Sequence, residues 1–410
     1  MSAVILKNSV QSSKLQTIHF ASIIVQGNNY SNQPRIIKNP TTASLKRGTG
    51  GRSSFNGIVC TVFGNTGLVG RYLCNRLGKI GTQACHTYVQ HLILPHRSDF
   101  YFCKQLKLCG DLGQVLFNPF DLRDEESIYK CVKHSNVVVN LIGKDWPTNN
   151  FSYENVHVEG ARRIAKIAKK ACVERFIHVS SLNVSPNPKP LVLKQGSQFL
   201  KSKWEGECAV KEEFPEATII RPSTIFGMQD KFLTYYSSKW NQFMLTPVLW
   251  KKGEQTEKQP VHVSDVAAGI TAIILDHNTA GKTYQFVGPR RYKLRNLVEW
   301  IQRSITEEWE NMGSEILDLD KAPLFRLKVS LNDAFGITHR INHLHWEGIE
   351  KDSTSDVVLK DLPTLEDLGI ELASLEEQGA WDLKLYHRHA YYEKSFEEYK
   401  AIPPPECIPL

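Results

Sequence analysis

Acidic residues are missing from the first part of this sequence. Residues 1–52 contain seven Lys or Arg and no Asp or Glu, and the first acidic residue of the chain is Asp99. The same segment is rich in Ser, Thr, Asn and Gln, which is typical of a mitochondrial presequence. We expect residues 1–52 to be a targeting segment that is cleaved, with a disordered basic tail as the alternative.

The positive charge of the chain comes from this segment. The whole sequence has 50 Lys and Arg against 43 Asp and Glu, so its net charge of +7 equals the number of basic residues in 1–52. The rest of the chain is formally neutral and lacks the basic excess typical of proteins that bind nucleic acid. We therefore expect no nucleic-acid partner.

Long apolar runs and patterned cysteines are also missing. No stretch approaches the roughly 18 to 20 apolar residues of a membrane-spanning helix, so we expect no transmembrane segment. The nine cysteines form no C-x-x-C pair and no zinc-site spacing with His. This odd, unpatterned set argues against a secreted disulfide scaffold and against a metal site, and favours a reducing compartment.

From about Ser53, short β-branched runs alternate with helical stretches, a pattern that predicts a parallel sheet covered by helices. We assign residues 53–290 to a Rossmann-type, doubly wound α/β domain. Residues 291–410 are expected to form a smaller, mainly helical C-terminal region that contacts partners. The expected strands are 58–64, 91–97, 113–121, 136–143, 175–181 and 217–223, and the expected helices are 68–79, 124–134, 154–171, 200–213 and 293–308.

Three glycines spaced three apart follow the first expected strand, in the segment VFGNTGLVGR at 62–71. Gly64 would allow a tight turn, Gly67 a close approach of the backbone to a pyrophosphate, and Gly70 close packing of the following helix on the strand. The start of that helix would offer free N–H groups to the phosphates. The loop therefore predicts a dinucleotide site.

The second expected strand ends at Arg97, where a site for NAD would place an Asp or Glu on the ribose. An Arg there can pair with a 2′-phosphate, which favours NADP(H), or it is a surface Arg at a strand end. Arg97 lies about thirty residues beyond the glycine loop instead of the usual twenty or so. Residues 84–91 therefore look like an insertion.

Polar groups also follow the later strands. Asp121 can accept a hydrogen bond from adenine or cap the helix that begins near Asp124. Residues 140–143, and Ser180 with Ser181, lie at strand ends where parallel sheets bind ligands, or they simply cap those strands. His262 and Asp265 either border the cleft or belong to a helix cap.

Five segments together resemble the extended and atypical short-chain dehydrogenase/reductases. They are GNTGLVG, DLRD at 121–124, NVHVEGARRIAKIAKKACVERFIHVSS at 155–181, RPSTIFG at 221–227 and HVSDVAAG at 262–269. More narrowly, roughly residues 50–390 are similar to a family of NADPH-binding, short-chain-dehydrogenase-like accessory subunits of mitochondrial complex I. Its more specific phrases include GGRSS before the first strand and NLIGKDW after the fourth.

This resemblance and the patterns above define a set of candidate cofactor-binding residues. They are Gly64, Asn65, Thr66, Gly67, Leu68, Val69, Gly70, Arg97, Asp121, Leu122, Leu141, Ile142, Gly143, Ser180, Lys203 and Pro222.

One position separates cofactor binding from catalysis. Active short-chain dehydrogenases carry a Tyr four residues before a Lys on one helix face; the Lys binds the nicotinamide ribose, and the Tyr transfers the proton that accompanies hydride. The matching positions here are Phe199 and Lys203, and phenylalanine has no hydroxyl. We therefore expect no catalytic residue at this site, unless the alternative pair Tyr235 and Lys239 serves, which lies after the sixth strand.

The resemblance implies a protein that holds NADPH tightly without turning it over, on the matrix side of the mitochondrial inner membrane. Its partners would be other subunits of complex I, with the membrane surface nearby, and NADPH would support assembly near the junction of the peripheral and membrane arms. The aromatic segment 381–392 would be an interface or a helix core. The alternative functions are an autonomous NADP(H)-dependent reductase or epimerase, and a regulator with an exchangeable cofactor.

Overall fold

The structure is a computed structural model that describes residues 58–82, 89–97, 99–110, 113–238, 241–243, 246–305, 316–335, 344–386 and 402–409. All of these residues belong to one compact unit, Thr41–Leu410. The expected presequence at 1–52 and Lys239 lie outside the described residues, as do 387–392 of the aromatic segment.

A seven-stranded parallel sheet forms the centre of the described unit, in the order β11-β6-β5-β4-β1-β2-β3. The chain runs outward from β1 in one direction, returns, and continues from β4 in the other, so the strand order reverses between β1 and β4. Ligands of open parallel sheets bind outside the carboxyl ends of strands at such a reversal. The strands are β1 (Ile58–Phe63), β2 (Val89–His96), β3 (Val115–Pro119), β4 (Val137–Asn140), β5 (Arg175–Val179), β6 (Thr218–Pro222) and β11 (Thr283–Phe286).

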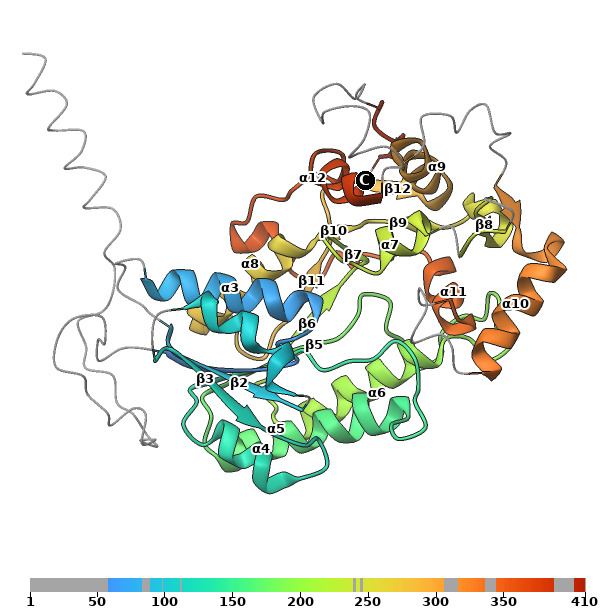
Figure 1. The fold of residues 1–410 in the computed structure, drawn as a ribbon. Coiled ribbons are helices and arrows are strands. Elements are labelled where there is room, and N and C mark those ends of the chain that lie inside the picture. The colour runs from blue at the N-terminus through green and yellow to red at the C-terminus, as the bar shows by residue number, and fades with distance from the viewer. Residues whose placement is uncertain are drawn as a thin grey trace, which may run out of the picture. The chain divides into compact units, whose positions relative to one another are not determined.

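Helices cover both faces of the sheet, as Figure 1 shows. On one face lie α3 (Leu68–Thr82) and α8 (Val263–Leu275), and on the other α4 (Glu125–Val132), α5 (Gly160–Lys170) and α6 (Gln198–Glu213). Each face has its own hydrophobic core, because the strands are apolar on both sides. A π-helical turn, η3 (Glu154–Glu159), leads into α5.

The Rossmann-type fold predicted from the sequence is confirmed, and the six expected strands are all present. Two elements of this domain, helix α8 and strand β11, are missing from the predicted strands and helices. Helix α8 carries β-branched residues and a glycine within an almost wholly apolar run, which obscures helical periodicity. Strand β11 has only four residues. Residues 89–91, the end of the segment interpreted as an insertion, belong to β2, and residues 84–88 lie outside the described residues.

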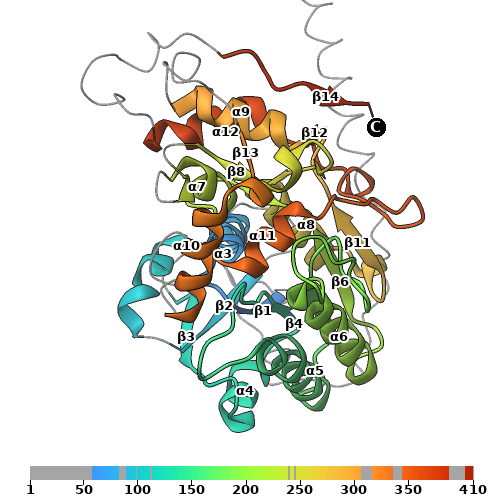
Figure 2. The same cartoon turned by 90° about the vertical axis from the view of Figure 1, so that its right-hand side faces the viewer.

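The C-terminal region adds helices and small sheets to one end of this core. Its helices are α9 (Leu294–Ile305), α10 (Pro323–Ala334), α11 (Trp346–Ser353) and α12 (Leu375–Leu383). Helix α9 packs on α7 (Phe232–Ser237), whereas α11 contacts α6 and α10 (Figure 2). The small sheets pair β7 (Ile225–Phe226) with β10 (Val261–His262), β8 (Val248–Leu249) with β13 (Leu317–Asp318), and β12 (Arg291–Lys293) with β9 (Glu257–Lys258) and β14 (Cys407–Ile408).

Candidate cofactor site

A cavity of about 380 Å³ opens at the carboxyl ends of the central strands. One side is formed by the glycine loop, by the ends of β4, β5 and β6, and by α6. The other side comes from residues 345–356, which include α11. Ten of the candidate residues line it: Gly64, Gly67, Leu68, Val69, Gly70, Leu141, Gly143, Ser180, Lys203 and Pro222.

The glycine loop is built by close backbone contacts. Gly64 has φ of +85°, and a Cβ there would lie 3.0 Å from the carbonyl carbon of Leu141, so the ends of β1 and β4 nearly touch. A Cβ on Gly70 would lie 2.4 Å from the Gly64 carbonyl oxygen, which leaves no room for a side chain. At Gly67 a Cβ would meet only that same oxygen, at 3.3 Å. Gly67 therefore borders the cavity with little crowding from the chain itself.

Two candidate residues of the loop do not line the cavity. The Asn65 side chain is buried, and its Nδ2 donates to the carbonyl oxygens of Val62, at 3.4 Å, and Pro95, at 2.7 Å. This amide ties the loop to the end of β2. Thr66 is exposed at the loop surface.

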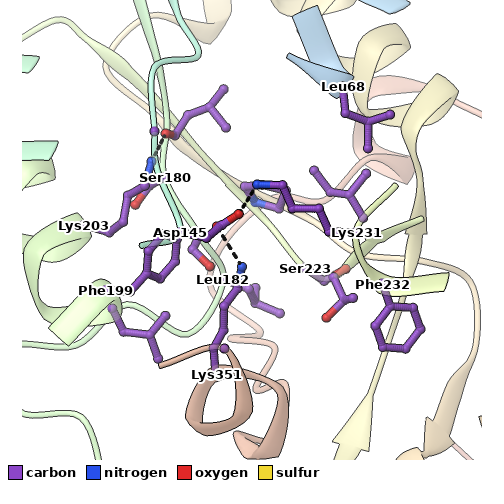
Figure 3. Close-up of a pocket in the computed structure, with 18 of the residues that line it drawn as sticks. Leu68, Asp145, Ser180, Leu182, Phe199, Lys203, Ser223, Lys231, Phe232 and Lys351 are labelled. Carbon is purple, nitrogen blue, oxygen red and sulfur yellow. Dashed lines mark hydrogen bonds and ion pairs between the residues drawn. The ribbon is translucent and has the colours of Figure 1, made fainter. Parts of the chain in front are cut away.

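Lys203 and Ser180 lie together in the cavity, as Figure 3 shows. The Lys203 Nζ donates to the Val179 carbonyl oxygen at 3.2 Å, and burial lowers the pKa of Lys203 to about 8 although Asp145 opposes that shift. The Ser180 Oγ is buried and has no hydrogen-bond partner among the residues that the structure describes. A Cβ on Gly143 would lie 3.0 Å from the Lys203 Nζ, so the absence of a side chain at Gly143 leaves room for the Lys203 ammonium group.

Phe199 lies on α6 one turn before Lys203, in the spacing that the sequence predicted. Its ring is 5% exposed and packs edge-on against His157, with ring centroids 5.3 Å apart. The Lys351 Nζ lies 4.6 Å from the centroid of the Phe199 ring. The ring thus has apolar and cationic neighbours, and it offers no proton.

The cavity also carries charged groups that the sequence did not point to. Asp145 binds Lys231, and its other carboxylate oxygen lies 3.5 Å from the Lys351 Nζ. Burial alone would raise the pKa of Asp145, but Lys351 and Lys231 together hold it well below its usual range. The side chains of Lys258 and Asp356 are also buried, with Nζ and Oδ1 3.8 Å apart.

Sequence reasoning missed these groups for a physical reason. Asp145, Lys231 and Lys351 come from three segments far apart in the chain, and nothing local distinguishes them from surface residues. NLIGKDW contains Asp145 beside three candidate cofactor residues, Leu141, Ile142 and Gly143, but its pattern does not point to the carboxylate. The segment around Lys351 was assigned to partner contacts.

Four further candidate residues lie outside the cavity lining: Arg97, Asp121, Leu122 and Ile142. Arg97 is exposed, and its Cζ lies 5.5 Å from the centroid of the Phe151 ring; the Arg123 Cζ lies 4.5 Å from the same centroid. Leu122 belongs to the core beneath α5, and Ile142 is half-buried after β4.

Two expected caps are placed differently by the structure. Asp121 does not cap α4, because the carboxylate of Asp124 accepts from the N–H groups of Glu126 and Ser127. Asp121 is exposed and accepts from the Arg123 N–H at 2.8 Å.

At the start of α8, no side chain caps the helix. The His262 Nδ1 instead bonds with the Ser264 hydroxyl at 2.6 Å, and Asp265 accepts from the Ala373 N–H at 2.8 Å. Neither His262 nor Asp265 lines the cavity.

Tyr235, the alternative proton donor, does line the cavity. It stands on α7 and not on the helix of Lys203, and burial raises the pKa of its phenol well above the usual range. Within the described ranges, no cluster of His, Cys, Asp or Glu is suited to hold a metal ion. The helices of those ranges also include none with the length and apolarity that crossing a bilayer requires.

Comparison with known proteins gives a family and two kinds of relative. Residues 60–287 match the model of the NAD dependent epimerase/dehydratase family. The mouse (Mus musculus) mitochondrial NADH dehydrogenase (ubiquinone) 1 alpha subcomplex subunit 9 is 42% identical over 87% of this chain and 88% of its own. The mitochondrial 40 kDa subunit of the Neurospora crassa NADH-ubiquinone oxidoreductase is 37% identical over 90% of this chain and 92% of its own.

Solved structures support the fold at low sequence identity. A dTDP-glucose 4,6-dehydratase from Streptomyces venezuelae, with NAD and TYD bound, has a TM-score of 0.56 at 15% identity, over 82% of this chain and 99% of that one. An Escherichia coli NADPH-dependent quinone oxidoreductase complexed with NADPH has a TM-score of 0.57 at 14% identity, over 79% and 99%. The family match over more than half of the residues and the identity with the mouse and Neurospora proteins together show that the chain belongs to the NAD dependent epimerase/dehydratase family and, within it, to the group of the mitochondrial alpha subcomplex subunit 9 proteins.

Proposed function

We propose that this chain is a non-catalytic accessory subunit of mitochondrial complex I that holds NADPH as a structural cofactor. The place in the complex is supported by its relatives, which are named as subunits of NADH dehydrogenase (ubiquinone) and NADH-ubiquinone oxidoreductase. The observation that carries the non-catalytic role is the pair on α6: Lys203 is in place for a nicotinamide ribose, but Phe199 stands where a proton donor is needed. Loss of such a donor typically costs about 10²- to 10⁴-fold in rate.

The residues present fit a dinucleotide. The three glycines leave space beside the start of α3 for a pyrophosphate, whose charge the helix N-terminus favours. The unpartnered Ser180 Oγ and the Lys203 ammonium provide polar groups for the nicotinamide end. When bound, the nicotinamide would supply hydride chemistry, which this site does not use.

A group of cations favours NADPH over NADH. Arg97 follows β2 and Arg123 follows β3, and both guanidinium groups stack near the Phe151 ring. Lys144, which lines the cavity, has its pKa lowered by burial and then by the nearby Arg97 and Lys231. A 2′-phosphate would relieve this concentration of positive charge.

Location and assembly follow from the same proposal. The chain would lie on the matrix side of the inner membrane, bound to other complex I subunits near the junction of the two arms. NADPH would stabilise the folded chain by binding it in preference to the unfolded chain, by about 2.7 kcal/mol at a free concentration 100 times Kd. Loss of the cofactor would then weaken assembly.

The test is a Gly67→Ala variant expressed in mitochondria that lack the natural chain. The added methyl faces the cavity with a single close contact in the chain itself, so it should lower NADPH affinity by the order of tenfold or more while the fold persists. We expect lower NADPH content and less assembled complex in a native gel. Normal assembly with an empty site would contradict the proposal.

Gly281→Ala is the matched control. Gly281 has φ of +73° in a turn away from the cavity, so alanine there destabilises the chain by roughly 1 kcal/mol without touching the site. If assembly follows NADPH and not general stability, Gly281→Ala keeps both the cofactor and the complex.

An autonomous NADP(H)-dependent reductase or epimerase is the second candidate. One observation favours it: Tyr235 lines the same cavity as Ser180 and Lys203 and carries the hydroxyl that Phe199 lacks. Incubation of the purified, NADPH-loaded chain with carbonyl and quinone acceptors separates the two. Oxidation of NADPH that Tyr235→Phe abolishes would establish the reductase.

A further inference from the structure

We propose that helix α11 occupies the side of the cavity where a substrate would bind. A bridge from Lys231 through Asp145 to Lys351 holds the helix there. The proposal rests on the proposed function in that the opposite side of the cavity receives the cofactor. It concerns a different part of the molecule, because the bridge joins the Rossmann-type domain to the C-terminal region.

The first support is the way α11 is fastened to the chain that enters α6. The Glu347 carboxylate accepts from the Phe199 N–H at 2.8 Å and from the Ser197 hydroxyl at 2.5 Å. The Glu350 side chain is fully buried, and its carboxylate accepts the N–H groups of the preceding loop at 2.7 to 2.9 Å, those of Leu191, Val192 and Leu193. A buried carboxylate is stable only with such partners. Because these N–H groups donate to α11, their hydrogen exchange reports whether α11 stays in place.

The second support is the bridge itself. In Figure 3, Asp145 lies between Lys231 and Lys351, with Lys203 and Ser180 to one side. One carboxylate oxygen of Asp145 binds Lys231, and the other lies 3.5 Å from Lys351. All three side chains line the cavity and come from the segment after β4, the segment before α7, and α11. The bridge therefore spans the cavity between both of its sides.

The third support is the position of Lys351 over the Phe199 ring. Its Nζ lies 4.6 Å from the ring centroid, a favourable cation–π distance. Burial opposes the charge of Lys351, but Asp145, Asp352 and Glu347 together more than offset this, so the pKa of Lys351 is raised and the ammonium persists at neutral pH.

A substrate that reacted at this helix position would have to approach within about 3 to 3.5 Å of a donor on residue 199. The approach over this ring face is already taken by Lys351. The site is thus blocked by its own chain in addition to lacking the donor. A hydroxyl restored at position 199 would project from the edge of the ring, and a substrate that reached it would have to share the cavity with Lys351.

The experiment uses the full chain with the variants Lys351→Met, which removes one end of the bridge, and Asp145→Asn, which removes its centre. Hydrogen exchange of residues 191–200 is followed by mass spectrometry without NADPH, and NADPH release from the loaded chain is followed by its fluorescence. Each variant should speed both processes by about five- to tenfold, the scale of one partly exposed ion pair with a cation–π contact. The double variant should add little, because both changes remove the same bridge.

Lys360→Met is the control, since Lys360 is an exposed lysine after the same helix. It should leave both rates at the wild-type value. Unchanged hydrogen exchange in Lys351→Met and Asp145→Asn would overturn the proposal, and so would faster exchange without faster NADPH release. If the wild-type chain binds no NADPH, the proposed function fails, while the exchange of residues 191–200 in the unloaded chain still decides whether the bridge holds α11.

Discussion

The two sides of the cavity differ in what their residues leave open. On the glycine-loop side, backbone takes the place of side chains, and Gly67 borders the cavity with one close contact. On the α11 side, charged side chains fill the space and bind each other, as Asp145 does with Lys231 and Lys351. One side keeps room for a ligand, and the other is occupied by the chain. On our proposal, this difference lets a family fold keep a cofactor site after its reactive half has been closed.

The largest effect should come from breaking the glycine-loop side with Gly70→Val. A Cβ at Gly70 would lie 2.4 Å from the Gly64 oxygen and 2.7 Å from the Asn65 Cα, and these backbone atoms cannot turn aside. We expect a loss of stability of about 3 kcal/mol or more together with loss of NADPH binding, measured by denaturant unfolding and by titration. The Gly67→Ala variant, with its single contact at 3.3 Å, should lose affinity with under about 1 kcal/mol of stability. Equal destabilisation of the two variants would contradict the geometry given for the loop.

A smaller effect is expected at Lys203 of α6, where removal of the charge should raise the stability of the cofactor-free chain and weaken NADPH binding. Its folded pKa of about 8 is below its unfolded value, so the unfolded chain binds more protons between about pH 8 and 10.5. The buried charge therefore costs stability below pH 8, and that cost disappears as the pH rises through this window. Lys203→Met should stabilise the cofactor-free chain by about 1–2 kcal/mol at pH 7 and flatten its stability above pH 8, while it weakens NADPH binding.

Thermal unfolding as a function of pH checks this prediction, and Lys201→Met is the matched control. Lys201 lies on the same helix but is exposed, so its removal should change neither the pH profile nor NADPH affinity. A destabilised Lys203→Met chain at pH 7 would mean that the lysine is structural and not retained for a ligand.

The smallest effect is expected from Phe199→Tyr, which restores the missing hydroxyl on the α11 side. The new oxygen adds one atom to a packed ring, so stability should change by about 1 kcal/mol or less, with NADPH binding unchanged. No acceptor should be reduced as long as Lys351 covers the ring, and the measurement is NADPH oxidation with carbonyl and quinone acceptors. Turnover by this single variant would show that the proton donor alone was missing and that the α11 side is open.

The sequence predicted the side of the cavity that depends on local pattern. Gly64, Gly67 and Gly70 are recognisable because one strand, one turn and one helix start are contiguous in the chain. The spacing of Phe199 and Lys203 is recognisable because a helix brings every fourth residue to the same face. Both signals need only one or two neighbouring elements.

The α11 side depends on tertiary structure and was not predicted. Asp145, Lys231 and Lys351 meet only after the C-terminal region has folded against the sheet, and an isolated Lys or Asp reads as a surface residue. The sequence did not point to Arg123 for a related reason. Arg97 and Arg123 follow different strands, and their guanidinium groups both lie over the Phe151 ring only in the folded chain. Interactions between distant segments leave no local period that a sequence could display.

We propose above that the chain holds NADPH and does not use it. The most direct test is to isolate the assembled complex from mitochondria on a native gel, release the nucleotide of this chain by denaturation, and identify it before and after incubation with hydride acceptors. We predict that the chain comigrates with the complex and carries about one NADPH, unchanged by the acceptors. A chain that migrates alone, is empty, or yields NADP⁺ after the incubation would contradict the account.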